Sequence, residues 1–267
     1  MRRLLIFSVS LAALAAVAGC AGEKTAGREP VLSADQRIAI SRVAAPLIEK
    51  SFGGRLDHPA VQAYVRTVGE RVARSLAGGG FPYQFFVLDT PVAAAVALPG
   101  GQVYVTRGLL MQLETEGELA GLLGHELAHI TAGHGEHIVG VTALAEAADK
   151  VPVNGPLPTG AAGRMIDEAV KKLLYVQYSA EMEKEADRLG LDYMVAAGYY
   201  PGEMVRLATT FGALAGPDAA WFRNIHTNPA GRADAVRQAV GRKYVDQAGR
   251  VGRQEYQREV LDRLKAG

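Results

Sequence analysis

The sequence predicts a mainly helical α+β domain that contains one small sheet of three strands. Long segments carry apolar residues at helical spacing, and three short apolar runs between residues 83 and 106 are divided by Pro and Gly turns. The hydrophobic content of 49% in 267 residues is enough to bury a full core. Length alone fits one domain or two small ones, and we expect a single domain at residues 31–267.

The first 30 residues have the pattern of a processed leader followed by a tether. Met1-Arg-Arg precedes an apolar run at residues 4–18, which is too short to span a membrane and is typical of a signal peptide. Residues 17–20, Val-Ala-Gly-Cys, resemble a bacterial lipobox, and an ordinary secretory leader is the alternative. The sequence therefore predicts a signal peptide at residues 1–19, lipidation of Cys20 and a flexible tether at residues 20–30.

The lipobox resemblance also implies a location. Ala21 follows the predicted lipidated cysteine, and in bacterial sorting an Asp at this position favours retention in the inner membrane. We therefore expect an anchor at the periplasmic face of the outer membrane, with the inner membrane as the less favoured site.

Charge and cysteine content exclude other classes of protein. The formal charge is +1, and it becomes −1 when Arg2 and Arg3 leave with the leader, so nothing indicates a nucleic-acid partner. Cys20 is the only cysteine, which excludes an internal disulfide.

The N-terminal half of the domain is predicted to hold two helices before the sheet. Ser33 and Gln36 have the spacing of a capping box, which opens a helix that continues to residue 47. A second helix is expected at residues 59–76, before the Gly-rich segment 78–82. The three strands follow at residues 83–88, 93–98 and 102–106.

The C-terminal half is predicted to be helical. A helical turn is expected at residues 109–113, and acidic residues at 116–118 favour the start of a longer helix. Residues 151–163 contain three prolines and form a loop that either borders a cleft or is disordered. A long helical pattern then runs from about residue 165 to residue 197, and short helices separated at residues 212–218, 228–231 and 249–252 complete the chain.

The helix after residue 116 carries the pattern His-Glu-x-x-His at residues 125–129. Residues four apart on an α-helix lie on the same side, about 6 Å apart along the axis, so His125 and His129 can bind one metal ion. Glu126 borders that face and can act as the general base toward a water molecule at the metal. Two histidines on a helix without a third ligand hold zinc poorly, so the interpretation requires another ligand.

The third ligand is predicted at Glu183, in the acidic segment 181–187. Helical phasing assigns Glu181 and Glu185 to a solvent-facing stripe and Met182, Leu189 and Tyr193 to a buried one, with Glu183 and Asp187 facing partly inward. One Zn²⁺ per chain, bound by Glu183 and the two histidines, explains the inward acids if Asp187 accepts the second N–H of a ligand histidine. The alternative is an acidic helix face with salt bridges to Lys184 or Arg188.

The other histidines are assigned weaker roles. His134 is nine residues from His125, about 180° round a continuous helix, so it is expected to point away from the metal. His134, His137 and His58 are therefore interpreted as structural or solvated.

Several of these segments together resemble one known family. Residues 97–110, the run from Glu118 to His134, and Glu183-x-Glu185-Ala-Asp187 are similar to the HtpX and CaaX-prenyl-protease family of zinc metalloendopeptidases. The lipobox and the lack of spanning segments make the chain most similar to periplasmic lipoprotein members of the LoiP and BepA kind. The resemblance covers residues 57–232 and implies a gluzincin, zincin-like domain, with zinc held by His125, His129 and Glu183 and with Glu126 as base.

The chain departs from this family in two places. The family often has Asn-Ala-Phe-Ala before Leu-Pro-Gly-Gly, whereas residues 94–97 read Ala-Ala-Val-Ala. It also often has Thr-His-Pro near the C-terminus, where this chain has Asn228 in the histidine position and His226 two residues earlier. Either His226 substitutes, as a group that hydrogen-bonds a developing oxyanion, or that function is lost.

The favoured function is hydrolysis of peptide bonds in misfolded or unassembled envelope proteins. Zincin substrates usually lie extended beside an edge strand, for which residues 93–98 or 102–106 are the candidates. The alternative is a zinc-binding periplasmic chaperone or assembly factor with little proteolysis, in which residues 151–163 or His226 close the site. A deformylase is discounted because it needs a cysteine ligand and Cys20 lies at the leader junction.

Overall fold

The computed structural model describes residues 32–76, 81–139, 141–151, 177–226 and 229–266, with single positions between 156 and 172. Side chains at 139, 141–144, 229 and 230 are not described. The predicted leader, Cys20, the tether, Asn228 and most of the segment 151–163 lie outside the described residues.

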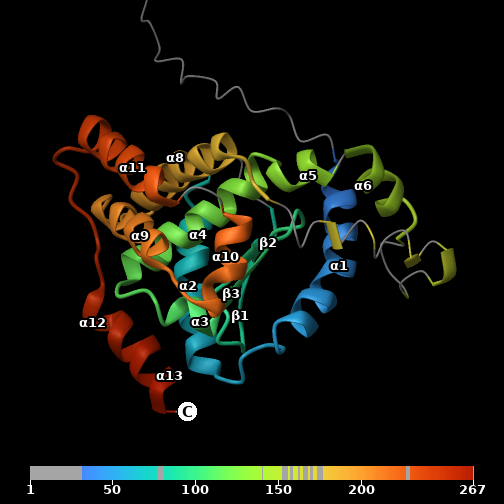
Figure 1. The fold of residues 1–267 in the computed structure, drawn as a ribbon, viewed down its shortest axis with the longest axis horizontal. Helices are drawn as coiled ribbons and strands as arrows, with labels where there is room; N and C mark the ends of the chain where they lie inside the picture. The colour runs from blue at the N-terminus through green and yellow to red at the C-terminus, as the bar shows by residue number, and fades with distance from the viewer. Residues whose placement is uncertain are drawn as a thin grey trace, which may run out of the picture.

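The predicted α+β class is confirmed: helices surround one three-stranded sheet (Figure 1). In chain order the described elements are α1 (Ala34–Ser51), α2 (Pro59–Ala73), β1 (Gln84–Leu88), β2 (Ala95–Ala97), β3 (Gln102–Thr106), α3 (Arg107–Leu110), α4 (Glu116–Thr131), α5 (His134–Val139), α6 (Val141–Ala148), α8 (Ala180–Ala196), α9 (Gly202–Ala213), η1 (Pro217–Ala219), α10 (Ala220–Ile225), α11 (Pro229–Lys243), α12 (Arg253–Tyr256), η2 (Gln257–Leu261) and α13 (Asp262–Ala266).

The sheet has the strand order β1-β3-β2. β1 is parallel to β3, and β2 is antiparallel to it. The prediction that residues 102–106 offer a substrate-binding edge is therefore wrong, because β3 is paired on both sides. Of the two candidates, only β2 lies at an edge.

The alternation of side chains along the strands divides the core between the two faces of the sheet. Phe85, Val87 and Val103 point to the larger core with α2 and α4. Phe86 and Tyr104 point to a smaller core with α1 and α6. Because side chains of a strand alternate between faces, these five-residue strands contribute to both cores.

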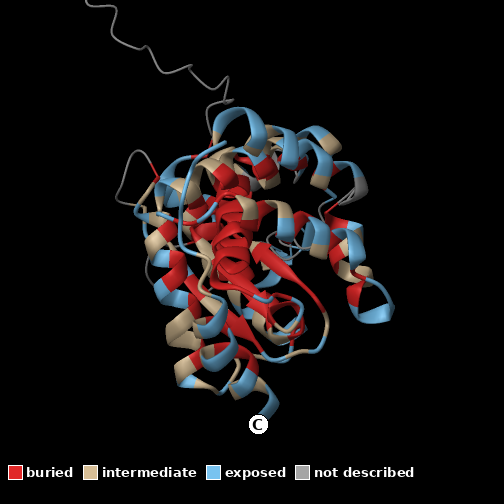
Figure 2. Cartoon of the chain, turned by 90° about the vertical axis from the view of Figure 1, so that its left-hand side faces the viewer, coloured by how far each residue is buried: buried red, intermediate tan, exposed pale blue. Residues whose placement is uncertain are grey.

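Helix α4 is the centre of the molecule, and Figure 2 shows it buried along its length. It crosses α8 where Gly124 faces Gly190. A Cβ built on Gly190 would lie 2.7 Å from the backbone nitrogen of His125, and one on Gly124 would lie 2.8 Å from the carbonyl oxygen of Gly190. Two glycines at the crossing thus let the backbones approach closely enough for side chains of both helices to meet.

The ends of three helices can be compared with the predictions made from local sequence signals. The capping box of α1 is present as predicted, with Gln36 N–H donating to Ser33 Oγ. The helix predicted from about residue 165 to residue 197 is not continuous: the described positions 163, 164, 168, 171 and 172 are helical, but Tyr178 is extended, its N–H donates to the carbonyl of Ile225, and α8 begins at Ala180. The predicted break at 228–231 lies too late in the chain, since α10 ends at Ile225 and α11 begins at Pro229 and runs through Gly231.

The buried face of α8 also differs from the prediction. Met182, Leu189 and Tyr193 are only half-buried. The fully buried positions are Glu183, Ala186, Asp187, Gly190, Leu191 and Met194. The stripe is rotated because α8 presents its small and acidic residues to α4.

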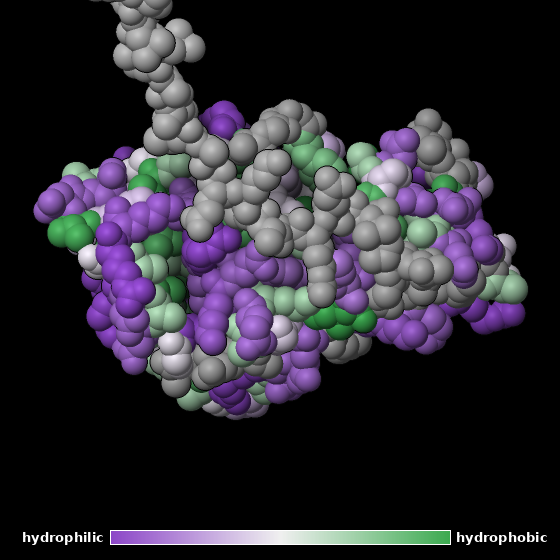
Figure 3. Space-filling model, turned by 90° about the horizontal axis from the view of Figure 1, so that it is seen from above, coloured by the Kyte–Doolittle hydropathy of each residue, from purple (hydrophilic) through white to green (hydrophobic). Residues whose placement is uncertain are grey.

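Few large hydrophobic side chains of the described residues are exposed. On the face shown in Figure 3 the hydrophobic side chains form small separate groups. Large exposed hydrophobic residues in the described part are Ile138, Tyr200 and Val245. None of the described helices is long and apolar enough to cross a membrane.

Candidate metal centre

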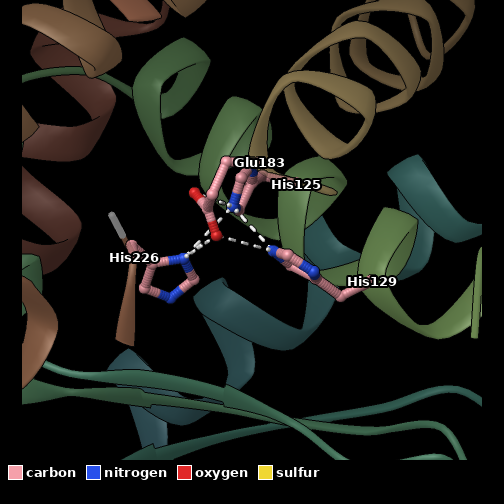
Figure 4. Close-up of side chains that lie close together, drawn as sticks. All are labelled: His125, His129, Glu183 and His226. Atoms are coloured by element: carbon pink, nitrogen blue, oxygen red, sulfur yellow. Dashed lines mark hydrogen bonds and ion pairs between the residues drawn. The ribbon is translucent and has the colours of Figure 1, made fainter. Parts of the chain in front are cut away.

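Two helices bring the three predicted ligands together, as Figure 4 shows. α4 carries His125 and His129, whose Nε2 atoms are 3.0 Å apart. Glu183, in the first turn of α8, has Oε1 3.5 Å from His129 Nε2 and Oε2 3.6 Å from His125 Nε2. The competing carboxylate Glu181 is exposed and Glu185 is half-buried, so of these three acids only Glu183 faces the Nε2 atoms of His125 and His129.

His226 is the fourth member of the group. It follows α10, and its Nδ1 lies 3.0 Å from Glu183 Oε1 and 3.4 Å from His125 Nε2. The ligand atoms of His125, His129, Glu183 and His226 all lie within 4.8 Å of one another. His226 therefore reaches the group from two residues before Asn228, as it must if it substitutes for the family histidine.

The donor set fits a tetrahedral metal ion. Ligand atoms held 2.0–2.2 Å from a central ion in a tetrahedron lie about 3.3–3.6 Å apart, close to the contacts of 3.0–3.6 Å found here. Imidazole nitrogen and carboxylate oxygen are ligands that zinc and related transition metals accept. All four residues are buried, and Arg232 is paired with Glu183, so the carboxylate stays charged and able to bind a cation. The group can therefore bind a metal ion.

Glu126, the predicted base, borders the group. Its Oε1 lies 3.6 Å from His226 Nε2, and neither atom makes a hydrogen bond within the described part of the chain. Burial raises the pKa of Glu126, although the histidines lower it in part. A carboxylate with a raised pKa and an unpaired oxygen beside the ligand atoms is suited to accept a proton there.

Asp187 and Arg232 support the ligands from behind. Asp187 Oδ1 is 3.0 Å from His125 Nδ1, the position predicted for it. Arg232, on α11, donates from Nε to Asp187 Oδ2 at 2.7 Å and from Nη2 to Oδ1 at 2.6 Å, and it also forms an ion pair with Glu183. Burial would raise the pKa of Asp187, but the Arg232 guanidinium outweighs it and holds that pKa at about 2. Arg232 is not among the residues predicted from the sequence. The second buried acid, Asp187, could have indicated it, because a buried carboxylate needs a cation of its own.

The expectation of a continuous helix through His134 is wrong, although His134 is not a member of the candidate metal group. α4 ends at Thr131, and Gly133 adopts a positive φ of 66°, so the helix is not continuous to residue 134. His134 Nδ1 consequently lies 2.9 Å from His129 Nδ1, and its Nε2 lies 3.4 Å from Glu185 Oε2. His134 is thus a partner of a predicted ligand and not a solvated residue.

Tyr178 is a second contact that the sequence did not reveal. Its ring stacks on His129 with centroids 3.8 Å apart, and the extended segment before α8 holds it there.

Burial lowers the pKa of His129 well below 6.5, which keeps the imidazole neutral and able to bind a metal.

The chain is similar in sequence to several known proteases. The chain is 26% identical over 196 residues to the beta-barrel assembly-enhancing protease of Yersinia pestis, covering 65% of this chain and 37% of that protein. It is 26% identical over 160 residues to the mitochondrial metalloendopeptidase OMA1 of Arabidopsis thaliana, covering 60% and 32%. It is 25% identical over 173 residues to metalloprotease YcaL of Escherichia coli K12, covering 64% and 68%.

The share of each relative that the chain covers is small, whereas the family profile matches most of this chain. The chain spans about a third of the length of the assembly-enhancing protease and of OMA1. The sequence profile of peptidase family M48 matches residues 59–240, which include His125, Glu126, His129 and Glu183. Because this match covers more than half of the chain, the chain belongs to peptidase family M48 and is a metallopeptidase.

Proposed function

We propose that the protein is a zinc-dependent endopeptidase that is anchored by lipid at the periplasmic face of the outer membrane and cleaves misfolded or unassembled envelope proteins. The observation that carries this proposal is the buried group of His125, His129 and Glu183 with the unpaired Glu126 oxygen beside it. Family membership supports the reaction class.

Within the proposed reaction, Glu126 and the ligand residues have separate roles. His125, His129 and Glu183 hold the zinc ion, which when bound polarises the scissile carbonyl and lowers the pKa of a water molecule. Glu126 Oε1 takes the proton of the attacking water and then delivers it to the nitrogen of the leaving amine. Arg232 and Asp187 keep Glu183 and His125 in position.

The substrate is proposed to bind as an extended strand beside β2. β2 lies at an edge of the sheet, and residues 94–97 occupy the position of the family's Asn-Ala-Phe-Ala segment. Backbone hydrogen bonds give such binding little dependence on side chains, which suits a protease for unfolded proteins.

The decisive test compares wild type with Glu126→Gln. We expect fluorescein-labelled casein to be cleaved by wild type and not by the variant, while zinc content stays near one ion per chain in both. Activity at wild-type rate in Glu126→Gln, purified from a strain lacking other proteases, would contradict the proposed base.

The envelope location has a separate test. The leader pattern before Cys20 and the name of the beta-barrel assembly-enhancing relatives support it, since β-barrels of this type are outer-membrane proteins. We expect radiolabelled palmitate to be incorporated into wild type and not into Cys20→Ser, and wild type to fractionate with outer membranes. Equal labelling of both forms would exclude the lipid anchor at Cys20.

A second function is favoured by the closure of the site. His125, Glu126, His129, Glu183 and His226 are each at most 2% exposed, so a substrate reaches them only after a rearrangement. A zinc-binding chaperone or assembly factor would have such a closed centre at all times. This second function predicts that wild type and Glu126→Gln suppress client aggregation equally and that neither cleaves the client.

A further inference from the structure

Helix α5 links the surroundings of the metal centre to the N-terminal helix α1 (Figure 1). Its first residue, His134, contacts His129, and its third residue, Glu136, forms an ion pair with Arg37 of α1, in which Oε1 lies 2.9 Å from Nε. Both side chains of the ion pair are buried, with 9% of Arg37 and 3% of Glu136 exposed. A buried pair of charges outside the ligand group therefore lies two residues from His134.

Polar contacts hold α5 in its place. Of its side chains that the structure describes, the buried ones are His134 and Glu136, whereas Ile138 is 41% exposed. None of these described side chains belongs to a hydrophobic core. A helix of six residues also gains little stability from its own hydrogen bonds. The orientation of α5 therefore depends on what His134 and Glu136 contact.

Helix α1 is a fixed partner for Glu136. Its buried apolar side chains pack in the smaller core, namely Ala39, Ile40, Val43, Ala44 and Ile48. The N–H of Gly100, in the turn between β2 and β3, donates to Ser41 Oγ at 2.6 Å. Because α1 is attached to the sheet in these two ways, the ion pair fixes α5 relative to the sheet.

The ion pair also packs on the turn that precedes His134. A Cβ built on Gly133 would lie 3.8 Å from Glu136 Oε2 and 3.9 Å from Arg37 Nη2. Gly133 has a φ of 66°, and this turn sets the direction in which the chain leaves α4. A change in the ion pair is therefore transmitted to His134 through one short turn of backbone.

Stability alone explains this ion pair poorly. Arg37 Nε and Nη2 and Glu136 Oε2 make no hydrogen bond with the described part of the chain. Burial raises the pKa of Glu136, and Arg37 lowers that pKa only in part. Apolar side chains of similar size often replace such a pair without loss of stability. A positional role accounts for the two buried charges better.

We propose that Arg37 and Glu136 are positioning residues for the metal centre, which hold the first turn of α5 so that His134 stays within hydrogen-bond distance of His129 Nδ1. This role rests on the metal centre proposed above, because it is as a ligand that His129 needs a fixed orientation. Neither Arg37 nor Glu136 is a member of the ligand group, and both act through His134.

The test removes both charges together, with Arg37→Met and Glu136→Leu in one chain, which avoids an unpaired buried charge. We expect zinc binding, measured by competition with a chromogenic chelator, to weaken at least about fivefold, because a ligand histidine loses its orienting partner. Arg37→Lys keeps a cation beside Glu136 and should bind zinc more tightly than the double variant. If the double variant does not fold, Glu136→Gln takes its place in each measurement.

Asp149→Ala is the matched control. Asp149 is exposed and accepts a hydrogen bond of 3.0 Å from Gln36 Nε2, one residue before Arg37. The substitution removes a contact of α1 with the end of α6 but leaves the ion pair intact. The control should bind zinc with the affinity of wild type.

A double-mutant cycle decides whether the ion pair acts through His134. In the background of His134→Ala, removal of both charges should have no further effect on zinc affinity, because the contact that they maintain is already lost. Loss of affinity by the same factor in both backgrounds would assign the pair a general structural role and would overturn the proposal.

The metal-free chain provides an independent measurement. In wild type, NMR of the labelled imidazole nitrogens should show a ring N–H between His129 and His134 that is protected from exchange with water, and the double variant should lose it. The proposal is overturned if this protected N–H persists in the double variant, or if the double variant binds zinc as wild type does. A wild type that binds no zinc would contradict the proposed function, whereas the NMR comparison would still decide what positions His134.

Discussion

At the scale of single residues, the orientation of each ligand follows from what lies behind it. If His129 Nε2 faces a metal ion, its Nδ1 carries the proton and donates it to His134 Nδ1 across 2.9 Å. His134 then carries its own proton on Nε2, directed at Glu185 Oε2. Burial lowers the pKa of His134, in agreement with a neutral imidazole. The tautomers of both histidines are thereby fixed by one carboxylate.

Substitution of His134 tests this chain of hydrogen bonds. We expect His134→Ala to weaken zinc binding about 10- to 100-fold, because His129 loses the acceptor that orients it. His134→Asn, whose amide oxygen can accept the same proton, should recover part of the loss. Competition with a chromogenic chelator measures both affinities. Equal affinity of His134→Ala and wild type would show that His134 does not orient His129.

His226 occupies the remaining side of the group. Its Nδ1 faces Glu183 and His125, while its Nε2 faces Glu126 Oε1 at 3.6 Å. If a metal ion is held by His125, His129 and Glu183, His226 lies where it would compete with a water molecule for the fourth ligand position. We expect His226→Ala to cleave casein several-fold faster than wild type, as measured by release of fluorescein peptides. A fall in the cleavage rate to that of Glu126→Gln would instead indicate that His226 hydrogen-bonds the developing oxyanion.

At the scale of secondary-structure elements, the glycines where α4 crosses α8 determine whether the ligands meet. A Cβ on Gly190 would be 2.7 Å from His125 N and 2.9 Å from His125 Cα. Gly190→Ala should therefore force the helices apart, with a loss of about 1–3 kcal/mol in unfolding free energy and weaker zinc binding. Urea denaturation and chelator competition measure the two effects.

Gly241 provides the matched control for that substitution. It lies in α11, and a Cβ there would meet nothing within 4 Å. Gly241→Ala should raise the unfolding free energy by about 0.5–1 kcal/mol, because alanine has less conformational freedom to lose in a helix. If Gly190→Ala behaved like Gly241→Ala, close approach at the crossing would not be what positions the ligands.

The first residue of α4 is bound from several sides. Glu116 accepts hydrogen bonds from Tyr64 at 2.6 Å and Tyr199 at 2.9 Å, and from Arg250 at 2.6 and 3.0 Å. Burial would raise the pKa of Glu116, but these donors outweigh it and hold that pKa below 4.5. The carboxylate therefore fixes the start of α4 to α2 and to the C-terminal segment.

Glu116→Gln should lower the unfolding free energy at pH 7 by about 2–4 kcal/mol, because the amide cannot accept all of these bonds. The folded-state pKa lies below the unfolded one. The stabilisation by Glu116 is thus fully present above pH 4.5 and is lost as the pH falls through the folded-state pKa. Urea denaturation should show the difference between wild type and variant shrinking at acid pH. A difference that stays constant would contradict a role for the charged form.

At the scale of the whole molecule, the metal group links parts of the chain that are distant in sequence. Its members come from α4, α8 and the end of α10. Arg232, which forms an ion pair with Glu183, connects α11 to the same group. A ligand that binds only the folded state stabilises it by about 2.7 kcal/mol at 100 times its Kd. We expect a chelator to lower the melting temperature of the chain and added zinc to restore it.

Glu126→Gln is the control for that experiment, since its side chain is outside the ligand group and should leave the shift in melting temperature unchanged. A melting temperature that is insensitive to both chelator and zinc would argue against a metal ion at this site.

Local sequence signals were enough to predict most of the elements and most of the candidate site. Capping, strand alternation and the His-Glu-x-x-His spacing are local, so the start of α1, the three strands and the shared side of His125 and His129 follow from a few neighbouring residues. Helical phasing likewise predicted that Glu183 and Asp187 face inward. The leader, the lipidation of Cys20 and the role of residues 151–163 remain predictions.

Tertiary structure alone decided the contacts between distant segments. The central position of β3, the start of α8 at Ala180 and the pairing of Arg232 with Asp187 each depend on partners tens of residues away. Gly133 ended α4 early and placed His134 behind His129, although helical geometry predicted the opposite side. No local pattern encodes which backbone will lie beside another, because that choice depends on how both cores pack.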